Sequence, residues 1–374
     1  MPTLLALDFD LGPELEAALR RCVEVAQAFC VLDRRLSQSR RATELKILGA
    51  THVSDSTGTR ALRGGAEVGD DIALVMLTSG SSGQPKAVQH TWGSLRSSAE
   101  ITQASLHREG PPVWFPCLPA NHIGGLAVLL RAILGDAQLL WDKSFDISSA
   151  ALKGATLVSL VRAQLLRHDV SGFDAVLVGG ARPPGRLPPN VIATWGMTET
   201  GSGVVYNSHP LRGVEVAAVH GQICVRTPTL FHSYRDAPRP QVTGPDGAGD
   251  WFPTGDGGEV RDGLVRVRGR LGFMINTGGE KLWPEDLESA LATVAGVRDI
   301  AVTSRDDPEW GQLVVALVVS KDTALDRALR STAEERIGPW AKPKEIRYVD
   351  VIPRTSNGKI RRDLIAQAVS RPTC

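Results

Sequence analysis

Between Asp71 and Gly196, short apolar runs alternate with stretches of helical spacing, and this alternation constrains the fold more than any other feature. Such alternation is typical of an α/β domain with a largely parallel sheet. The runs are "DIALVMLTS", "PPVWFPCLP", "LAVLLRAIL", "AQLLW", "ATLVSLVRAQLLR", "DAVLVGG" and "NVIATWG". An earlier stretch, "GPELEAALRRCVEVAQAF", has apolar residues at helical spacing and predicts an amphipathic helix. We therefore expect a large α/β N-terminal domain with mainly parallel sheets.

The pattern changes after Val204. Up to Arg270 the apolar runs are short and separated by Gly, Pro and Asp, which predicts a β-rich subdomain. A new series of strand-like and helical runs follows, including "PEDLESALATVAGV", "DIAVTS" and "QLVVALVVS". Its elements are few, so we expect a small, mobile α+β C-terminal domain. The predicted domains are residues 1–270 and 271–374, with the boundary near "GRLGF".

Composition and charge argue against several classes of protein. Lys and Arg number 42 and Asp and Glu 41, so no overall field favours nucleic acid or an anionic membrane. No segment approaches the ~18–20 uninterrupted apolar residues of a membrane span, and the N-terminus has no basic leader. The five cysteines form no CxxC pair and show no metal-ligand spacing. We expect a cytoplasmic protein with small-molecule partners, no nucleic acid and no membrane insertion.

The stretch "LTSGSSGQPKAVQHT" looks at first like a phosphate-binding loop. A Walker loop has lysine directly after its last glycine and a hydroxyl residue next. Here Gly83 is followed by Gln84, Pro85, Lys86 and Ala87, which argues against an ordinary P-loop NTPase. A flexible linker is also disfavoured, because an apolar strand leads straight into the loop. A loop whose amides and hydroxyls wrap phosphate oxygens and a plain turn both remain.

Three further stretches resolve the choice. "WGMTETG" places Thr and Glu after an aromatic residue, "FPTGDGGEV" places Asp in what reads as a tight glycine turn, and "IPRTSNGKIRRDL" places Lys359 in a loop with glycine. The order TSGSSGQPK, WGMTE, TGD, GR and PRTSNGK resembles the acyl-adenylate-forming superfamily of acyl-CoA synthetases, adenylation domains and luciferases. The resemblance extends from about residue 70 to the end of the chain.

In this superfamily a carboxylate attacks the α-phosphate of ATP, although both reactants are anions. The site must therefore gather positive charge and amide dipoles around the phosphates, with help from Mg²⁺. The resemblance implies that Glu199 binds Mg²⁺ and that Thr198 contacts the α-phosphate. It also implies that the β- and γ-phosphates are held by Thr78, Ser79, Gly80, Ser81, Ser82, Gly83 and Lys86.

The same resemblance assigns the nucleoside. Asp256 matches the residue that accepts both ribose hydroxyls, and Arg270 matches the arginine that also reaches the ribose. Trp195 stands where the superfamily usually has Tyr, beside the base. The segment "VGGARPP" matches the lining of the adenine pocket, through Gly179, Gly180 and Ala181.

Lys359 matches the mobile catalytic lysine, which bridges carboxylate and phosphate during adenylation. Taken singly, these residues have plainer interpretations: Asp256 as the cap of a turn, Glu199 as the start of a helix, and Lys359 as a solvated surface lysine. The hinge position holds Gly272, where relatives usually carry Asp or Lys. Glycine widens the accessible backbone range and should ease rotation of the C-terminal domain.

Segments outside the shared motifs indicate the acid. "LPANHIGGLAVLLRA", "INTGGEKLWPEDLE" and "DDPEWGQ" resemble the o-succinylbenzoate–CoA ligases of menaquinone biosynthesis, and the short N-terminal region is similar to their actinobacterial members. This resemblance implies an acid–CoA ligase that uses ATP and CoA. It places His122 among the catalytic residues, in the acyl pocket. The short N-terminal region leaves that pocket either with a thinner wall or completed by a second subunit of a homo-oligomer.

A dianionic acid needs a cation for the carboxylate that does not react. Arg167 lies where these ligases carry such an arginine, and its spacing from Gln164 predicts one shared helix face. Arg162 is an alternative, and either arginine could instead lie on a solvated face. A ligase for another carboxylic acid, or a non-catalytic relative that only binds nucleotide, are the competing hypotheses.

Overall fold

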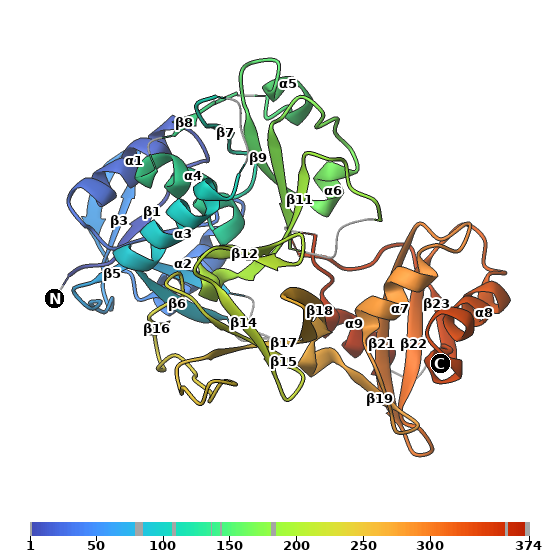
Figure 1. The fold of residues 1–374 in the computed structure, drawn as a ribbon. Coiled ribbons are helices and arrows are strands. Elements are labelled where there is room, and N and C mark those ends of the chain that lie inside the picture. The colour runs from blue at the N-terminus through green and yellow to red at the C-terminus, as the bar shows by residue number, and fades with distance from the viewer. Residues whose placement is uncertain are drawn as a thin grey trace. The chain divides into compact units, whose positions relative to one another are not determined.

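The computed structural model of the protein describes residues 2–78, 85–106, 110–135, 137–142, 144–180, 185–355 and 358–370. The chain divides into two compact units (Figure 1). The first comprises Met1–Val216, Val225–Phe252 and Asp262–Val265, and the second comprises Ala217–Cys224, Pro253–Arg261 and Arg266–Cys374. The predicted mobility of residues 271–374 stays a prediction.

Among the described residues, a mixed seven-stranded sheet has the order β16-β6-β5-β2-β1-β3-β4, in which β16 comes from a later part of the chain than the other strands. Its central strands pair in parallel, whereas β4, β6 and β16 run antiparallel to their neighbours. Strand β5 is buried over residues 72–76, as expected for an apolar run covered on both faces. The strands are β1 (Leu5–Leu7), β2 (Phe29–Val31), β3 (His52–Asp55), β4 (Gly58–Ala61), β5 (Ile72–Thr78), β6 (Lys86–Thr91) and β16 (Ser233–Tyr234).

A second seven-stranded sheet among the described residues has the order β13-β12-β11-β10-β9-β7-β8. The strands from β8 to β11 are parallel, and β12 and β13 are antiparallel. The prediction of an α/β fold with mainly parallel sheets is thus confirmed. The strands are β7 (Val113–Phe115), β8 (Gln138–Leu139), β9 (Leu157–Val161), β10 (Ala175–Gly179), β11 (Val191–Met197), β12 (Ser202–Tyr206) and β13 (His209–Pro210).

Helices α3 and α4 join the two sheets. They pack against each other; α3 contacts β5 and β6 of the first sheet and β12 of the second, and α4 contacts β7, β8 and β9 (Figure 1). The predicted amphipathic helix is α1, which begins at Pro13 and buries Leu15 and Leu19. The helices of this unit are α1 (Pro13–Glu24), α2 (Gln38–Leu48), α3 (Trp92–Ala104), α4 (Ile123–Leu134), α5 (Ile147–Ala150), α6 (Arg162–Leu165) and the 3₁₀ turn η1 (Thr198–Thr200).

The predicted β-rich stretch is distributed over three sheets. A four-stranded sheet has the order β14-β15-β17-β18, whereas β12, β13 and β16 of the same stretch complete the two larger sheets. Its strands are β14 (Glu215–Val219), β15 (Gln222–Arg226), β17 (Phe252–Arg261) and β18 (Leu264–Arg270). Sequence spacing identified the strands, but it carried no information on which sheet each would join.

The C-terminal part of the second unit is a five-stranded sheet with helices on both faces, as the predicted α+β domain requires. The strand order is β20-β19-β22-β21, with β23 beside β22. Alternate residues of β21 and β22 pack on α7 and α8 or on α9. The elements are β19 (Ile275–Thr277), β20 (Glu280–Leu282), β21 (Asp299–Asp307), β22 (Gly311–Val319), β23 (Glu345–Tyr348), α7 (Pro284–Leu291), α8 (Asp326–Arg336), α9 (Arg362–Ser370), η2 (Leu271–Phe273) and η3 (Pro339–Ala341).

Two adjacent glycines of α4 test how tightly this helix packs. A Cβ at Gly125 would lie 2.2 Å from the carbonyl oxygen of Pro119, whereas a Cβ at Gly124 would meet only Leu118 Cδ1, at 3.8 Å. We expect Gly125→Ala to lower the free energy of unfolding by about 1–3 kcal/mol through overpacking. Gly124→Ala should be neutral or stabilising by up to about 1 kcal/mol, because alanine favours helix. Urea unfolding measures both, and equal effects would contradict the close packing.

Candidate active site

Thr78 and Lys86 lie directly opposite each other where β5 and β6 form a hairpin. Lys86 is exposed, and its Nζ lies 4.9 Å from the centroid of the Tyr234 ring. The strand predicted to hold the Ser/Gly loop is therefore present, and the chain returns through an antiparallel partner. The other predicted phosphate contacts lie outside the described residues: Ser79, Gly80, Ser81, Ser82 and Gly83.

One face of β6 presents several polar groups. Side chains two residues apart share a face of a strand, so Lys86 and His90 point the same way. Tyr234 of β16 pairs with Val88, which lies between them, and so belongs to the same face. The side chains of His90 and Tyr234 both reach the turn that follows β11.

That turn is η1 with its flanking residues and carries two of the predicted site residues, Thr198 and Glu199. Gly201, at φ 69°, turns the chain back into β12. Trp195 is half-buried in β11, opposite Val205. A Cβ at Gly196 would lie 2.0 Å from the carbonyl oxygen of Ser202, so the two strands approach too closely there for any other residue. Glu199 is the second residue of the short 3₁₀ helix, which begins at Thr198, so it lies close to a helix start as its plainer interpretation held.

The backbone carbonyls of the turn accept hydrogen bonds from several elements. Such bonds are required because buried carbonyls have no access to water. The donors are His90 Nε2 to Thr198 (2.7 Å), Phe231 N to Glu199 (2.8 Å), Ser98 Oγ to Gly201 (3.2 Å) and Thr200 Oγ1 to Ser202 (2.7 Å). The Glu199 carboxylate accepts one more through Oε1, from the Tyr234 hydroxyl at 3.1 Å.

Arg131 of α4 lies behind the same turn. It is 3% exposed, its Nη2 donates to Ser202 Oγ at 3.1 Å, and its guanidinium lies 5.2 Å from the Trp114 ring centroid. No carboxylate in the described part of the chain forms an ion pair with it, and its Nε has no hydrogen-bond partner there. Burial lowers its pKa from the ordinary arginine value.

Asp256 and Arg270 are brought together in the second unit. Arg270 Nε lies 2.9 Å from Asp256 Oδ1, and Arg270 Nη1 donates to the carbonyl of Thr254 at 2.8 Å. Thr254 Oγ1 in turn accepts from Asp256 N and donates to the carbonyl of Ile223. The prediction that Asp256 sits in a tight turn is wrong: it lies inside strand β17, 7% exposed. The glycine-rich sequence suggested a turn, but of the three glycines in β17 only Gly255 has a positive φ, 76°.

Lys359 is exposed in the segment before α9. Its carbonyl accepts from Thr355 N at 2.7 Å, and its amide donates to Thr355 Oγ1 at 3.2 Å. Arg354 braces the same segment by donating to the Gly358 carbonyl and pairing with Asp299 at 2.7 Å. The predicted loop is therefore anchored on β21 by an ion pair.

Several residues predicted for the adenine and acyl pockets lie at the ends of two elements, β10 and α4. Gly179 ends β10, Gly180 follows at φ 83°, and Ala181 lies outside the described residues. His122 precedes α4 as its N-cap residue and is half-buried. Its neighbour Asn121 donates to the buried Asp33, at 3.3 Å.

The predicted shared face of Gln164 and Arg167 is wrong. Helix α6 ends at Leu165, so Arg167 lies in the turn beyond it, exposed to solvent. Gln164 Oε1 instead accepts from the backbone N of Val161, at 3.1 Å. A short helix with a self-capping glutamine cannot be distinguished from a longer one by spacing alone.

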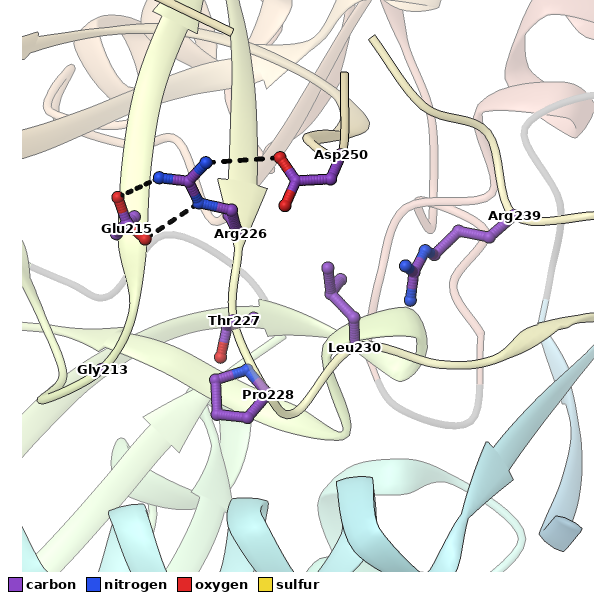
Figure 2. Close-up of a pocket in the computed structure, with 8 residues that line it drawn as sticks. All are labelled: Gly213, Glu215, Arg226, Thr227, Pro228, Leu230, Arg239 and Asp250. Carbon is purple, nitrogen blue, oxygen red and sulfur yellow. Dashed lines mark hydrogen bonds and ion pairs between the residues drawn. The ribbon is translucent and has the colours of Figure 1, made fainter. Parts of the chain in front are cut away.

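A surface pocket of about 200 Å³ lies elsewhere in the first unit (Figure 2). Arg226 crosses it, held by Glu215 and Asp250. The pocket is lined by Gly213, Glu215, Arg226, Thr227, Pro228, Leu230, Arg239 and Asp250. None of the predicted site residues belongs to it, and its facing cations and carboxylates neutralise one another.

The sequence did not single out His90 or Tyr234. A lone histidine in an apolar strand and a tyrosine in a β-rich stretch carry no distinguishing pattern. Only the pairing of β16 with β6 reveals that both residues reach Thr198 and Glu199.

His90→Gln should remove one source of acid destabilisation. Burial lowers the pKa of His90 from 6.5 to about 4. The unfolded chain therefore takes up a proton that the folded ring refuses. The favourable effect of neutral His90 on the free energy of unfolding is complete above pH 6.5 and is lost as the pH falls toward 4. At pH 4.5 the free energy of unfolding should be lower by roughly 2–3 kcal/mol because of this residue. Urea unfolding at pH 7 and 4.5 should show a larger loss for the wild type than for the variant. Equal losses would contradict titration of His90 in this window.

Comparison with known proteins agrees with the family that the motifs indicate. The family model "AMP-binding enzyme" matches residues 15–235, and "AMP-binding enzyme C-terminal domain" matches residues 286–359. A "Probable 2-succinylbenzoate–CoA ligase" of Mycobacterium tuberculosis (strain CDC 1551 / Oshkosh) is 35% identical over 333 residues, covering 81% of this chain and 86% of the relative. In the described ranges, none of the helices has the length and apolarity that a membrane crossing requires.

Two solved structures share the fold. Both are o-succinylbenzoate CoA synthetase (MenE) from Bacillus subtilis, one in complex with the acyl-adenylate intermediate OSB-AMP and the other with ATP and magnesium ion. The first has a TM-score of 0.81 at 23% identity, covering 97% of this chain and 88% of the other. The second has a TM-score of 0.80 at 23% identity, covering 96% and 88%. The family match spans more than half of the chain and the mycobacterial relative most of it, so the protein belongs to the AMP-binding enzyme family.

Proposed function

We propose that the protein is a ligase that joins 2-succinylbenzoate to CoA at the expense of ATP, through an acyl-adenylate and with release of AMP and pyrophosphate. The observation that carries the proposal is the 35% identity, over 81% of the chain, to a relative with that name. The fold shared with the MenE complexes supports it, because those structures hold ATP or the acyl-adenylate. The reaction would serve menaquinone biosynthesis in the cytoplasm, where ATP and CoA are available.

The phosphate contacts are proposed on the first unit. Thr78 and Lys86 flank the Ser/Gly loop, which fits a cradle for the β- and γ-phosphates. Thr198 would contact the α-phosphate from the turn after β11. Exposed Lys86 can meet a polyanion without a desolvation cost of its own.

Glu199 is the proposed carboxylate for Mg²⁺. It fits the ion: Oε1 accepts from Tyr234, and Oε2 accepts no hydrogen bond from the described residues. No group of three His, Cys, Asp or Glu side chains in those ranges could form a complete metal site. Mg²⁺ is usually bound through one or two carboxylates together with substrate phosphates and water. When bound, Mg²⁺ would neutralise charge on the phosphates.

Asp256 and Arg270 are proposed to bind the ribose. A carboxylate buried on a strand and held by a guanidinium keeps a fixed orientation, which suits acceptance of two hydroxyl hydrogen bonds. Gly179, Gly180, Ala181 and Trp195 are proposed to flank adenine.

Lys359 is proposed to bridge the attacking carboxylate and the α-phosphate. In this proposal residues 271–374 form a domain that turns about Gly272 between adenylation and thioester formation. Nothing lies within 4 Å of a Cβ at Gly272, so the surroundings leave room for movement there. The loop "NTGGEK", which joins β19 and β20, is proposed to meet CoA in the second pose.

His122 is proposed to line the acyl pocket, and Arg167, with Arg162 as the alternative, to pair with the carboxylate that does not react. Arg162 begins α6 and Arg167 follows that helix; both are exposed, and within the described residues neither forms an ion pair. A ligase for a different carboxylic acid therefore stays as the second candidate. A homo-oligomer that completes the pocket is also part of the proposal.

A panel of carboxylic acids tests the function. AMP release should depend on both CoA and the acid, and 2-succinylbenzoate should give the highest kcat/KM. Benzoate, which lacks the whole succinyl chain with its carboxylate, is the control and should be at least tenfold poorer. Preference for another acid would overturn the substrate and leave the ligase chemistry standing.

Lys359→Ala should separate the two half-reactions. Loss of a key electrostatic contact should slow adenylation, followed as ATP–pyrophosphate exchange, by on the order of 10²–10⁴. Thioester formation from supplied acyl-adenylate should be largely spared. Arg361→Ala, which removes an exposed cation paired with Asp363, is the control and should leave both steps near wild type. A matching loss in both steps would contradict the two-pose mechanism.

Asp256→Asn should weaken ATP binding without unfolding the protein. Charge-assisted hydrogen bonds contribute roughly 1.5–3 kcal/mol each, so the KM for ATP should rise on the order of 10- to 100-fold. Glu259→Gln changes a half-buried carboxylate on the same strand, β17, and should leave that KM alone. An unchanged KM in Asp256→Asn would leave the carboxylate a structural role only.

A further inference from the structure

His90 has an environment that neither its sequence context nor the proposed mechanism explains. It is fully buried on β6, yet it forms a hydrogen bond 108 positions along the chain. Its Nε2 lies 2.7 Å from the carbonyl oxygen of Thr198, and its Nδ1 lies 3.0 Å from Ser94 Oγ. A buried imidazole with both nitrogens engaged is costly to assemble, so its partners are informative.

The tautomer follows from these partners. A carbonyl oxygen can only accept, so Nε2 must carry a proton. Nδ1 faces Ser94 Oγ, whose single proton is within reach of both Nδ1 and the Thr91 carbonyl oxygen, at 3.0 and 3.1 Å. Burial lowers the pKa of His90 to about 4, which keeps the ring neutral at physiological pH.

The orientation of the Thr198 carbonyl affects the positions of two candidate site residues. It belongs to the peptide that joins Thr198 to Glu199, so its orientation sets where both side chains begin. The carboxylate of Glu199 is steadied separately, by the Tyr234 hydroxyl, and the far end of the turn by Ser98 and Arg131. The Thr198 carbonyl oxygen also accepts from Gly201 N, at 3.0 Å, and among the described residues His90 is the side chain that donates to it.

We propose that His90 is a positioning residue for adenylation, which holds the Thr198–Glu199 peptide so that Thr198 faces the α-phosphate and Glu199 faces Mg²⁺. This inference rests on the proposed function, because those two contacts belong to it. His90 touches no substrate in this proposal. It acts through the backbone, as a partner of a metal ligand fixes the orientation of that ligand.

A purely structural histidine and a positioning one differ in a measurable way. Replacement of a purely structural histidine would lower the melting temperature, while the protein that remains folded would keep its kinetics. Replacement of a positioning histidine would change the Mg²⁺ dependence and kcat of the folded enzyme. Side-chain replacements that preserve or remove the donor separate these alternatives.

The experiment compares His90→Leu, which removes the donor, with His90→Gln, whose Nε2 can still reach the Thr198 carbonyl. Tyr206→Phe is the matched control, because it removes another buried hydrogen bond, to Thr102 on α3, without touching the turn. ATP–pyrophosphate exchange with 2-succinylbenzoate is measured against Mg²⁺ concentration, well below each melting temperature. Calorimetric titration of Mg·ATP without acid is measured in parallel.

His90→Leu should raise the half-saturating Mg²⁺ concentration or lower kcat by about 10- to 100-fold. His90→Gln should recover most of this loss, and Tyr206→Phe should match the wild type in both, whatever its melting temperature. Wild-type kinetics in His90→Leu would overturn the proposal. If that variant does not fold, Ser94→Ala, which removes the hydrogen-bond partner of Nδ1, should show a smaller loss in the same direction. The absence of any loss in Ser94→Ala would then overturn the proposal.

The titration separates this inference from the choice of acid. A wild type that binds Mg·ATP but shows no exchange with 2-succinylbenzoate would refute the substrate alone. The affinity of His90→Leu for Mg·ATP would then still decide the role of His90, with a 10- to 100-fold loss expected. Unchanged affinity would overturn the positioning role, and a wild type without Mg·ATP binding would overturn both proposals.

Discussion

The candidate site of the first unit depends on the register of strand β6. Its ladder to β5 places Thr78 opposite Lys86, and its ladder to β16 places Val88 opposite Tyr234. A slip of one residue would turn Lys86 and His90 to the other face together. Hydrophobic burial opposes such a slip, because Val88 is fully buried. One set of backbone hydrogen bonds thus places the exposed lysine, the buried histidine and the tyrosine on one face, and the histidine and the tyrosine contact the turn.

Much of this architecture was predictable from the sequence because the apolar runs are long and regular. The run of β5, the strand-to-turn passage at Trp195 and the α+β pattern after Leu271 each carry a local signal of burial or periodicity. Strands β1–β4 were missed, since they are only three or four residues long and β4 is exposed throughout. Such short segments become strands through their neighbours.

The site residues divide along the same line. Motif order singled out Glu199, Asp256 and Lys359 as candidates without information on geometry, and it misled where glycines suggested a turn around Asp256. His90 and Tyr234 gave no local signal, because their contacts with the turn arise from strand pairing. The pair of Gln164 and Arg167 failed for the opposite reason: spacing suggested a relation that a short helix does not support. Contacts distant in the chain are what a single sequence reveals least.

Arg131 places a positive charge in the protein interior behind the turn. No carboxylate among the described residues forms an ion pair with this guanidinium, and an arginine keeps its proton even when burial lowers its pKa. Within the described residues its charge is therefore not cancelled by an ion pair, and it is surrounded by material of low dielectric constant, through which a field weakens slowly. The potential at the turn is made more positive from within the protein. A polyanion that approaches Thr198 would be attracted by this potential before it makes any contact, and bulk salt cannot screen the buried source as it screens exposed Lys86.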